Sequence, residues 1–230
     1  MRFGQPLLFG AAALALGACS LSPPAIQPVN YYLSATRGTP QAATKPVAVK
    51  VHPLRAAPLY ERRAFVYRLD GDRIVTDFYN QFAESPESII TSALIDWLKA
   101  AHVFKVVVDP GLPVDAPCTL DGSIVTLAGD LRNPAKPAAV LAIQFYLVRA
   151  RADGRDVLLD SLLEERVAIP AATAEALVQG YNVALTRIFE RLEREIEGLD
   201  LRGEQTGKRG DPNPAAARRS VDRTTLEARA

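Results

Sequence analysis

The stretch VLAIQFYLVRARADGRDVLLDSLLEERVAI, residues 140–169, decides the fold that this sequence predicts. Apolar side chains alternate with other residues in two runs, Val140–Arg149 and Val157–Ile169, on either side of Asp153-Gly154. A period of two predicts strands, and Asp-Gly between two such runs is typical of a turn. The first run places four apolar residues on one face: Leu141, Ile143, Phe145 and Leu147. The sequence therefore predicts a pair of long strands with one buried face.

Shorter strands are predicted upstream, where runs are rich in Val, Ile, Phe and Tyr. The sequence Asp70-Gly71-Asp72 predicts a hairpin turn between two of them. Asn133-Pro134 marks another turn, before the long pair. The upstream strands are expected at Val47–Val51, Arg63–Leu69, Arg73–Asp77, Phe104–Val108 and Leu120–Leu127.

A first helix is predicted to begin at Ser85-Pro86-Glu87, which offers an N-cap, a proline at the first helical position and an early acid. One apolar stripe at helical spacing follows. It consists of Ile89, Ile90, Ala93, Leu94, Trp97, Leu98 and Ala101.

A second helix is predicted from about Thr173 to Glu197. Its apolar stripe consists of Leu177, Val178, Tyr181, Leu185, Ile188, Leu192 and Ile196. Its solvent side is expected to carry Arg187, Glu190, Arg191, Glu193, Arg194 and Glu195. The order of elements predicts an α+β fold, a mixed, mostly antiparallel sheet with both helices packed on one face.

The amino terminus has the pattern of a secretory signal peptide. Arg2 precedes a short apolar run, and Leu16-Gly17-Ala18-Cys19 resembles the bacterial lipobox. That resemblance implies that Cys19 becomes the first residue of the mature chain and carries acyl chains, which together hold a protein firmly on a bilayer. Ser20, in place of an aspartate, implies sorting to the outer membrane. The alternative, a buried core helix, would be weakened by the small residues of this run.

The predicted organisation has four parts. Residues 1–18 form the signal peptide, and residues 19–46 form the acylated N-terminus with a Pro-rich tether. Residues 47–200 form the α+β domain. Residues 201–230, which carry few large apolar side chains, form a disordered polar tail. The chain has 27 Lys+Arg and 26 Asp+Glu, a balance that argues against nucleic-acid binding.

No catalytic or metal-binding pattern is present in the sequence. His52 and His102 are the only histidines, and neither has a neighbour at ligand spacing. Cys118 is read either as a reactive thiol or as a small buried hydrophobe, and the absence of a nearby cation favours the second reading. Glu164-Glu165 and Asp96 are read as solvent-facing charges. The sequence therefore predicts a protein that is not an enzyme and needs no cofactor.

Aromatic side chains mixed with amides lie just outside the regular elements. This composition is typical of a protein interface, and the alternative is that these rings cover the ends of the core. The candidate interface residues are Tyr31, Tyr32, Phe78, Tyr79 and Phe82.

Together these features resemble the ABC-type transport auxiliary lipoproteins, the PqiC-like family. The resemblance runs from the lipobox through Tyr31-Tyr32-Leu33, RRAFVYRLDGDRIVTDFYNQFAESPESIITSALIDWL (residues 62–98) and LDGSIVTLAGD (residues 120–130) to the closing helix. Gln81-Phe82-Ala83-Glu84 departs from the family, because many members carry Arg and Trp before the first helix.

The resemblance implies a lipid-anchored protein on the periplasmic face of the outer membrane of a Gram-negative bacterium. There it would dock a periplasm-spanning MCE-domain protein and, through it, an ABC permease and ATPase that move lipids or hydrophobic compounds. A homo-oligomeric ring is one arrangement that the resemblance allows. The alternative is an envelope assembly or scaffold lipoprotein unrelated to transport. A periplasmic hydrolase is a third class, and no nucleophile–base pair in the sequence supports it.

Overall fold

The computed structural model describes residues 27–38 and 45–201. The chain divides into two compact units, Met1–Leu199 and Asp200–Ala230, and the fold described below is that of the first. The predicted signal peptide, the lipobox with Cys19 and nearly all of the predicted tail lie outside the described residues.

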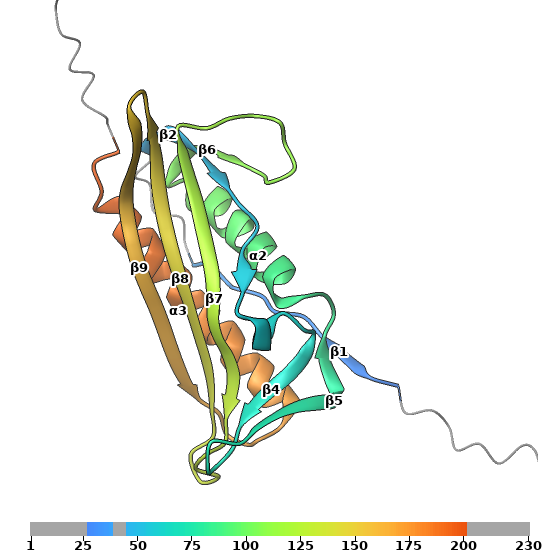
Figure 1. The fold of residues 1–230 in the computed structure, drawn as a ribbon. Helices are drawn as coiled ribbons and strands as arrows, with labels where there is room; N and C mark the ends of the chain where they lie inside the picture. Colours follow the sequence, from blue (N-terminus) through green and yellow to red (C-terminus); the bar gives the residue numbers. More distant parts are fainter. Residues whose placement is uncertain (1–26, 39–44, 202–230) are drawn as a thin grey trace, which may run out of the picture. The chain divides into compact units, whose positions relative to one another are not determined.

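The centre of the fold is an antiparallel meander of three long strands, drawn in green-yellow to brown in Figure 1. These strands are β7 (Cys118–Asp130), β8 (Ala138–Arg151) and β9 (Gly154–Ala168). The four apolar residues predicted to share a face of β8 are all fully buried. The long hairpin predicted from residues 140–169 is therefore confirmed, and the burial of one face explains why its register is fixed.

Three short strands lie one after another along the edge of β7 that faces away from β8. They are β2 (Lys45–Val51), β3 (Arg55–Ala56) and β4 (Ala64–Arg68), and all three run parallel to β7. The short helix η1 (Pro58–Tyr60) separates β3 from β4.

Three more strands complete the sheet beyond β2 and β4. Strand β6 (Phe104–Val108) pairs in parallel with β2, and β5 (Ile74–Phe82) pairs antiparallel with β4. Strand β1 (Val29–Tyr31) pairs in parallel with β5. The sheet so described has nine strands.

The α+β class and the mixed sheet are confirmed, but the expectation of a mostly antiparallel sheet is wrong. Five of the eight strand pairings among the described residues are parallel. Local sequence signals detect hairpins, whose strands are neighbours in the chain. The parallel pairings of β2, β3 and β4 with β7 join residues 62 to 69 positions apart, and no local pattern marks them.

The two predicted helices are α2 (Pro86–Ala101) and α3 (Ala174–Glu197). Helix α3 packs against β8 and β9, and Gly180 permits the close approach, because a Cβ there would lie 2.7 Å from the Cβ of Ala139. Helix α2 packs against β6 and contacts α3, with the ring of Trp97 5.6 Å from that of Phe189. The helix pair therefore forms one layer against the sheet (Figure 1).

The segment that precedes β2 is part of the fold. Residues 31–37 follow α3 from its first turn toward its end, and Leu33 is fully buried. The contacts advance along both segments: Tyr31 Oη donates to Glu175 Oε1 (2.7 Å), Ser34 N to Asn182 Oδ1 (2.9 Å) and Thr36 N to Thr186 Oγ1 (3.2 Å). The interval 19–46, predicted as a tether, thus contains residues that pack on the domain.

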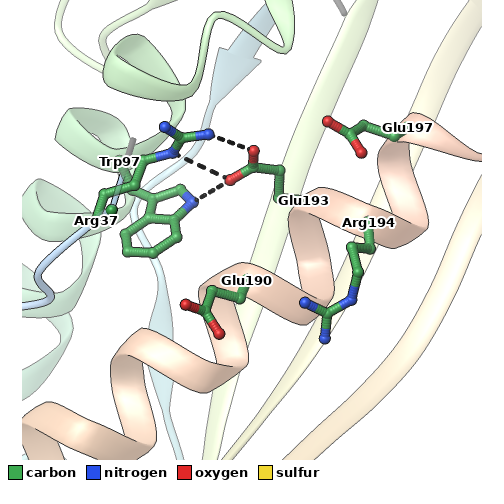
Figure 2. A pocket seen from close by; sticks show the side chains of 7 residues that line it. Arg37, Trp97, Glu190, Glu193, Arg194 and Glu197 are labelled. Atoms are coloured by element: carbon green, nitrogen blue, oxygen red, sulfur yellow. Dashed lines mark hydrogen bonds and ion pairs between the residues drawn. The ribbon is translucent and has the colours of Figure 1, made fainter. Parts of the chain in front are cut away.

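Glu193 joins this N-terminal segment to both helices (Figure 2). One of its carboxylate oxygens accepts from Trp97 Nε1 (2.9 Å) and Arg37 Nε (3.2 Å), and the other from Arg37 Nη2 (2.5 Å). The guanidinium lies 5.8 Å from the Trp97 ring centre, within cation–π range. Glu193 is 7% exposed, so its predicted place on the solvent side of the helix is wrong.

One donor of this cluster has no partner in the described chain. Arg37 Nη1 is buried and forms no hydrogen bond. It borders a hollow of about 260 Å³, also lined by Glu190 and Glu197, which has room for the water that such a donor requires.

Replacing Glu193 with Ala is expected to lower the free energy of unfolding by about 3–5 kcal/mol, because it leaves the Arg37 guanidinium buried without a counter-charge. Urea denaturation measures this loss. Glu190→Ala, one turn away and exposed, is the matched control and should change stability by less than about 0.5 kcal/mol. Equal effects of the two substitutions would contradict the role given to Glu193.

Candidate docking surface

A bulge in β5 creates the most exposed aromatic group of the described chain. Val66 of β4 pairs with Thr76 of β5, and the next pairing upstream in β4 joins Ala64 to Gln81. Four residues of β5, Asp77–Asn80, therefore lie opposite the single residue Phe65. Extra residues in one strand force it out of the plane of the sheet and re-aim its side chains.

Asp77 holds the bulge in place with both carboxylate oxygens. Oδ1 accepts from the backbone N–H groups of Tyr79 (2.8 Å) and Asn80 (3.0 Å). Oδ2 accepts from Tyr67 Oη (2.9 Å) and from Asn80 Nδ2 (2.9 Å). An aspartate that bonds the backbone two residues ahead is a common way of fixing such a turn. Four hydrogen bonds make this bulge an ordered feature rather than a loose loop.

The pKa values of Asp77 and Tyr67 reflect the same hydrogen bonds. Burial of Asp77 would raise its pKa, but the hydrogen bonds from Asn80, Tyr79 and Tyr67 outweigh it and hold the pKa below the usual range. Burial, followed by the bond to Asp77, raises the pKa of Tyr67. The carboxylate form of Asp77 is thus the form that supports the bulge.

The bulge turns two rings toward solvent. Phe78 is 78% exposed and Tyr79 is 48% exposed, and their rings stand edge to face with centres 5.2 Å apart. We call Asp77–Asn80 the aromatic bulge. Other exposed apolar side chains are Ile74 and Val75 at the start of β5, Val29 in β1, and Tyr32 just after β1. Exposed aromatic rings on a structured backbone are typical of the anchor residues of protein interfaces.

The backbone beside these rings is also available. Strand β1 pairs only with residues Asn80–Phe82 of β5, so among the described residues Ile74–Thr76 are paired on the β4 side alone. An unpaired strand edge carries N–H and C=O groups that another strand can use. The surface combines apolar rings with backbone hydrogen-bonding groups that no described strand pairs.

The structure divides the five predicted interface residues. Phe78 and Tyr79 form the aromatic bulge, and Tyr32 is also exposed, just after β1. Phe82, by contrast, is buried in the core. Its side chain is 2% exposed, and the centre of its ring lies 4.5 Å from that of Phe65 and 6.3 Å from that of Tyr181.

Tyr31 has an intermediate position between surface and core. Its ring lies 5.4 Å from that of Phe65, and its hydroxyl donates to Glu175. That hydrogen bond, with some burial, raises the pKa of Tyr31 to about 12. Tyr31 therefore serves to fix β1 against α3.

In the part of the chain that the structure describes, few side chains are arranged as in a catalytic or metal-binding site. His52 Nδ1 lies 2.9 Å from Asp121 Oδ1, with both side chains 42% exposed, beside a shallow hollow that Ser123 also lines. Among residues 27–38 and 45–201, no three His, Cys, Asp or Glu side chains are grouped so as to hold a metal ion. Cys118 is fully buried, which raises the pKa of its thiol and agrees with its reading as a small hydrophobe.

Among the described residues, no helix is long and apolar enough to cross a bilayer.

Known proteins identify the family. The sequence pattern of the ABC-type transport auxiliary lipoprotein component matches residues 31–193, most of the chain. The chain therefore belongs to this family of auxiliary components of ABC transport systems. No curated protein matches the chain.

Solved structures share the fold. Protein XCC0632 from Xanthomonas campestris, of family DUF330, superposes with a TM-score of 0.59 at 14% identity, over 75% of this chain and 95% of its own. An uncharacterized protein superposes with a TM-score of 0.57 at 12% identity, over 74% of this chain and 99% of its own. At these identities the likeness concerns the fold alone.

Removing the Asp77 carboxylate with Asp77→Ala is expected to lower the free energy of unfolding by about 1–3 kcal/mol, because the Tyr67 hydroxyl loses its acceptor. Phe78→Ala should change it by less than about 0.5 kcal/mol, because the ring is exposed. Urea denaturation at pH 7 compares the two.

The Asp77→Ala effect should also depend on pH. A depressed folded-state pKa stabilises the fold above the unfolded carboxyl pKa, near 3.8, and this contribution fades as the pH falls through the folded-state value. The difference from wild type should therefore shrink at low pH. A large loss of stability in Phe78→Ala would mean that the ring is structural and would remove it from the docking surface.

Proposed function

We propose that this protein is an outer-membrane lipoprotein that docks the periplasm-spanning MCE-domain protein of an ABC transporter. Through that partner it would meet the permease and ATPase of a system moving lipids or other hydrophobic compounds across the envelope. Membership of the transport auxiliary family supports the general role. The observation that carries the docking role is the aromatic bulge, which holds Phe78 and Tyr79 in water on an ordered backbone.

The anchor in this proposal is Cys19, acylated after cleavage behind Leu16-Gly17-Ala18. The packing of the N-terminal segment on the domain supports a short distance between the lipid anchor and the aromatic bulge. Val29 lies ten positions after Cys19, and a fully extended chain of ten residues spans at most about 35 Å. Because Val29 pairs beside Asn80 of the aromatic bulge, the bulge stays within that reach of the membrane.

Confinement near the membrane strengthens docking without new contacts. A partner that arrives at the outer membrane meets a binding surface whose effective concentration is set by the length of this connection. A modest interface is then sufficient, and the two exposed rings, with a strand edge that the described residues leave unpaired, would provide one. A ring of identical copies would multiply this effect.

A photo-crosslinking amino acid in place of Phe78, in cells that express the transporter, should capture the MCE-domain protein. The same probe in place of Tyr146, a partly exposed aromatic on β8, is the matched control and should capture much less. Cys19→Ser should reduce capture at residue 78, because the confinement is lost.

Two results would contradict the proposal. Equal capture from positions 78 and 146 would remove the docking role of the bulge. Capture at residue 78 of another outer-membrane assembly, with no MCE-domain protein, would favour the envelope scaffold.

A further inference from the structure

A third hollow, formed by elements other than those of the docking surface, has the composition of a ligand site. It lies between the β7–β8 loop, residues 131–137, and the connection from β9 to α3, residues 169–173. Its volume is about 580 Å³, within the range of small-molecule sites. Most of the lining is Ala, Pro and Ile, and the charged groups in it are Lys136 and Arg166, with no carboxylate.

Arg166 is held at the wall of the hollow by a buried acid. Asp130, 2% exposed, accepts from Arg166 Nη1 (2.5 Å) and from Arg132 Nε and Nη2 (2.9 and 2.6 Å). The bonds from Arg132 and then from Arg166, despite burial, hold the pKa of Asp130 far below its usual range. The carboxylate is thus permanently charged at neutral pH and fixes the guanidinium.

Both cations keep donors available for a ligand. The bond to Asp130 occupies one nitrogen of Arg166, and its other N–H groups form no hydrogen bond with the described residues. The Lys136 ammonium likewise has no hydrogen bond or ion pair in the described chain; only its backbone N–H donates, to Asn133 O (2.9 Å). Two cations that face one hollow without a carboxylate in its wall favour an anion.

The rest of the wall favours an apolar body attached to that anion. Ala135, Ala168, Pro170, Ala171 and Ala172 offer small side chains without hydrogen-bonding groups. Contact of a hydrocarbon chain with such a surface is favourable, because it removes apolar area from water. A free inorganic anion would use the cations but leave this wall in water.

We propose that this hollow binds an amphiphile, with its phosphate or carboxylate headgroup on Lys136 and Arg166 and its hydrocarbon against the Ala and Pro wall. The site is independent of the aromatic bulge, so neither proposal depends on the other. It gives the protein a small-molecule site in addition to its docking surface.

Isothermal titration calorimetry with dodecyl phosphate, below its micelle concentration, tests the site. The mature protein, residues 19–230, carries Cys19→Ser so that no acyl chain competes. Saturable one-to-one binding is expected, with inorganic phosphate at least tenfold weaker and uncharged dodecyl maltoside not binding.

Lys136→Glu should weaken dodecyl phosphate binding about tenfold or more, because it replaces a charge-assisted contact with a repulsive one. Lys105→Glu, on the exposed surface of β6, is the matched control and should leave binding unchanged. Three results would each overturn the proposal: no saturable binding, equal affinity for inorganic phosphate, or equal loss in the two variants.

Discussion

The carboxylate of Glu193 is the contact on which the arrangement of this protein depends. A buried charge is tolerated only when partners replace the water it has lost, and here Trp97 of α2 and Arg37 of the N-terminal segment supply three hydrogen bonds. Apolar packing alone would bring the helices together, but it is not directional. Glu193 adds direction, since its bonds form only when both helices and the N-terminal segment are in register.

The hydrogen bonds of Glu193 at one end of the N-terminal segment also help to determine where the other end of that segment lies. With Arg37 held at the end of α3 and Tyr31 bonded to Glu175 at its start, the intervening residues lie along the helix, and β1 is delivered to β5. The chain leading to the predicted anchor therefore departs beside the aromatic bulge. In this account, the same segment that completes the fold also sets the distance between membrane and docking surface.

Local sequence patterns predicted the strands and helices in which buried residues recur at a fixed spacing. The alternation around Phe145 and the stripe through Leu185 predicted β8 and α3, because each face of a strand or helix repeats at fixed spacing. The same reasoning failed where partners are distant. Glu193 has the sequence neighbours of a solvent-facing residue, and only the fold brings Trp97 and Arg37 to it.

The docking surface shows the same limit on a smaller scale. Phe78 and Phe82 stand four residues apart in one aromatic stretch, and the sequence treats them alike. The bulge fixed by Asp77 separates them, one ring in water and the other in the core. The Asp-x-Tyr-Asn order was a usable sign, because aspartates often bond the backbone two and three residues ahead. The packing of residues 31–37 on α3 was harder to predict from the sequence, since the prolines around Tyr31-Tyr32-Leu33 resemble a tether.

Hydrogen–deuterium exchange of the backbone amides of Ser34 and Thr36 tests the central claim most directly. Both amides donate to α3 side chains in the structure. If the N-terminal segment is part of the fold, both should exchange orders of magnitude more slowly than in an unstructured peptide. Exchange at the rate of a free peptide would contradict the account, because nothing would then hold the aromatic bulge near the anchor.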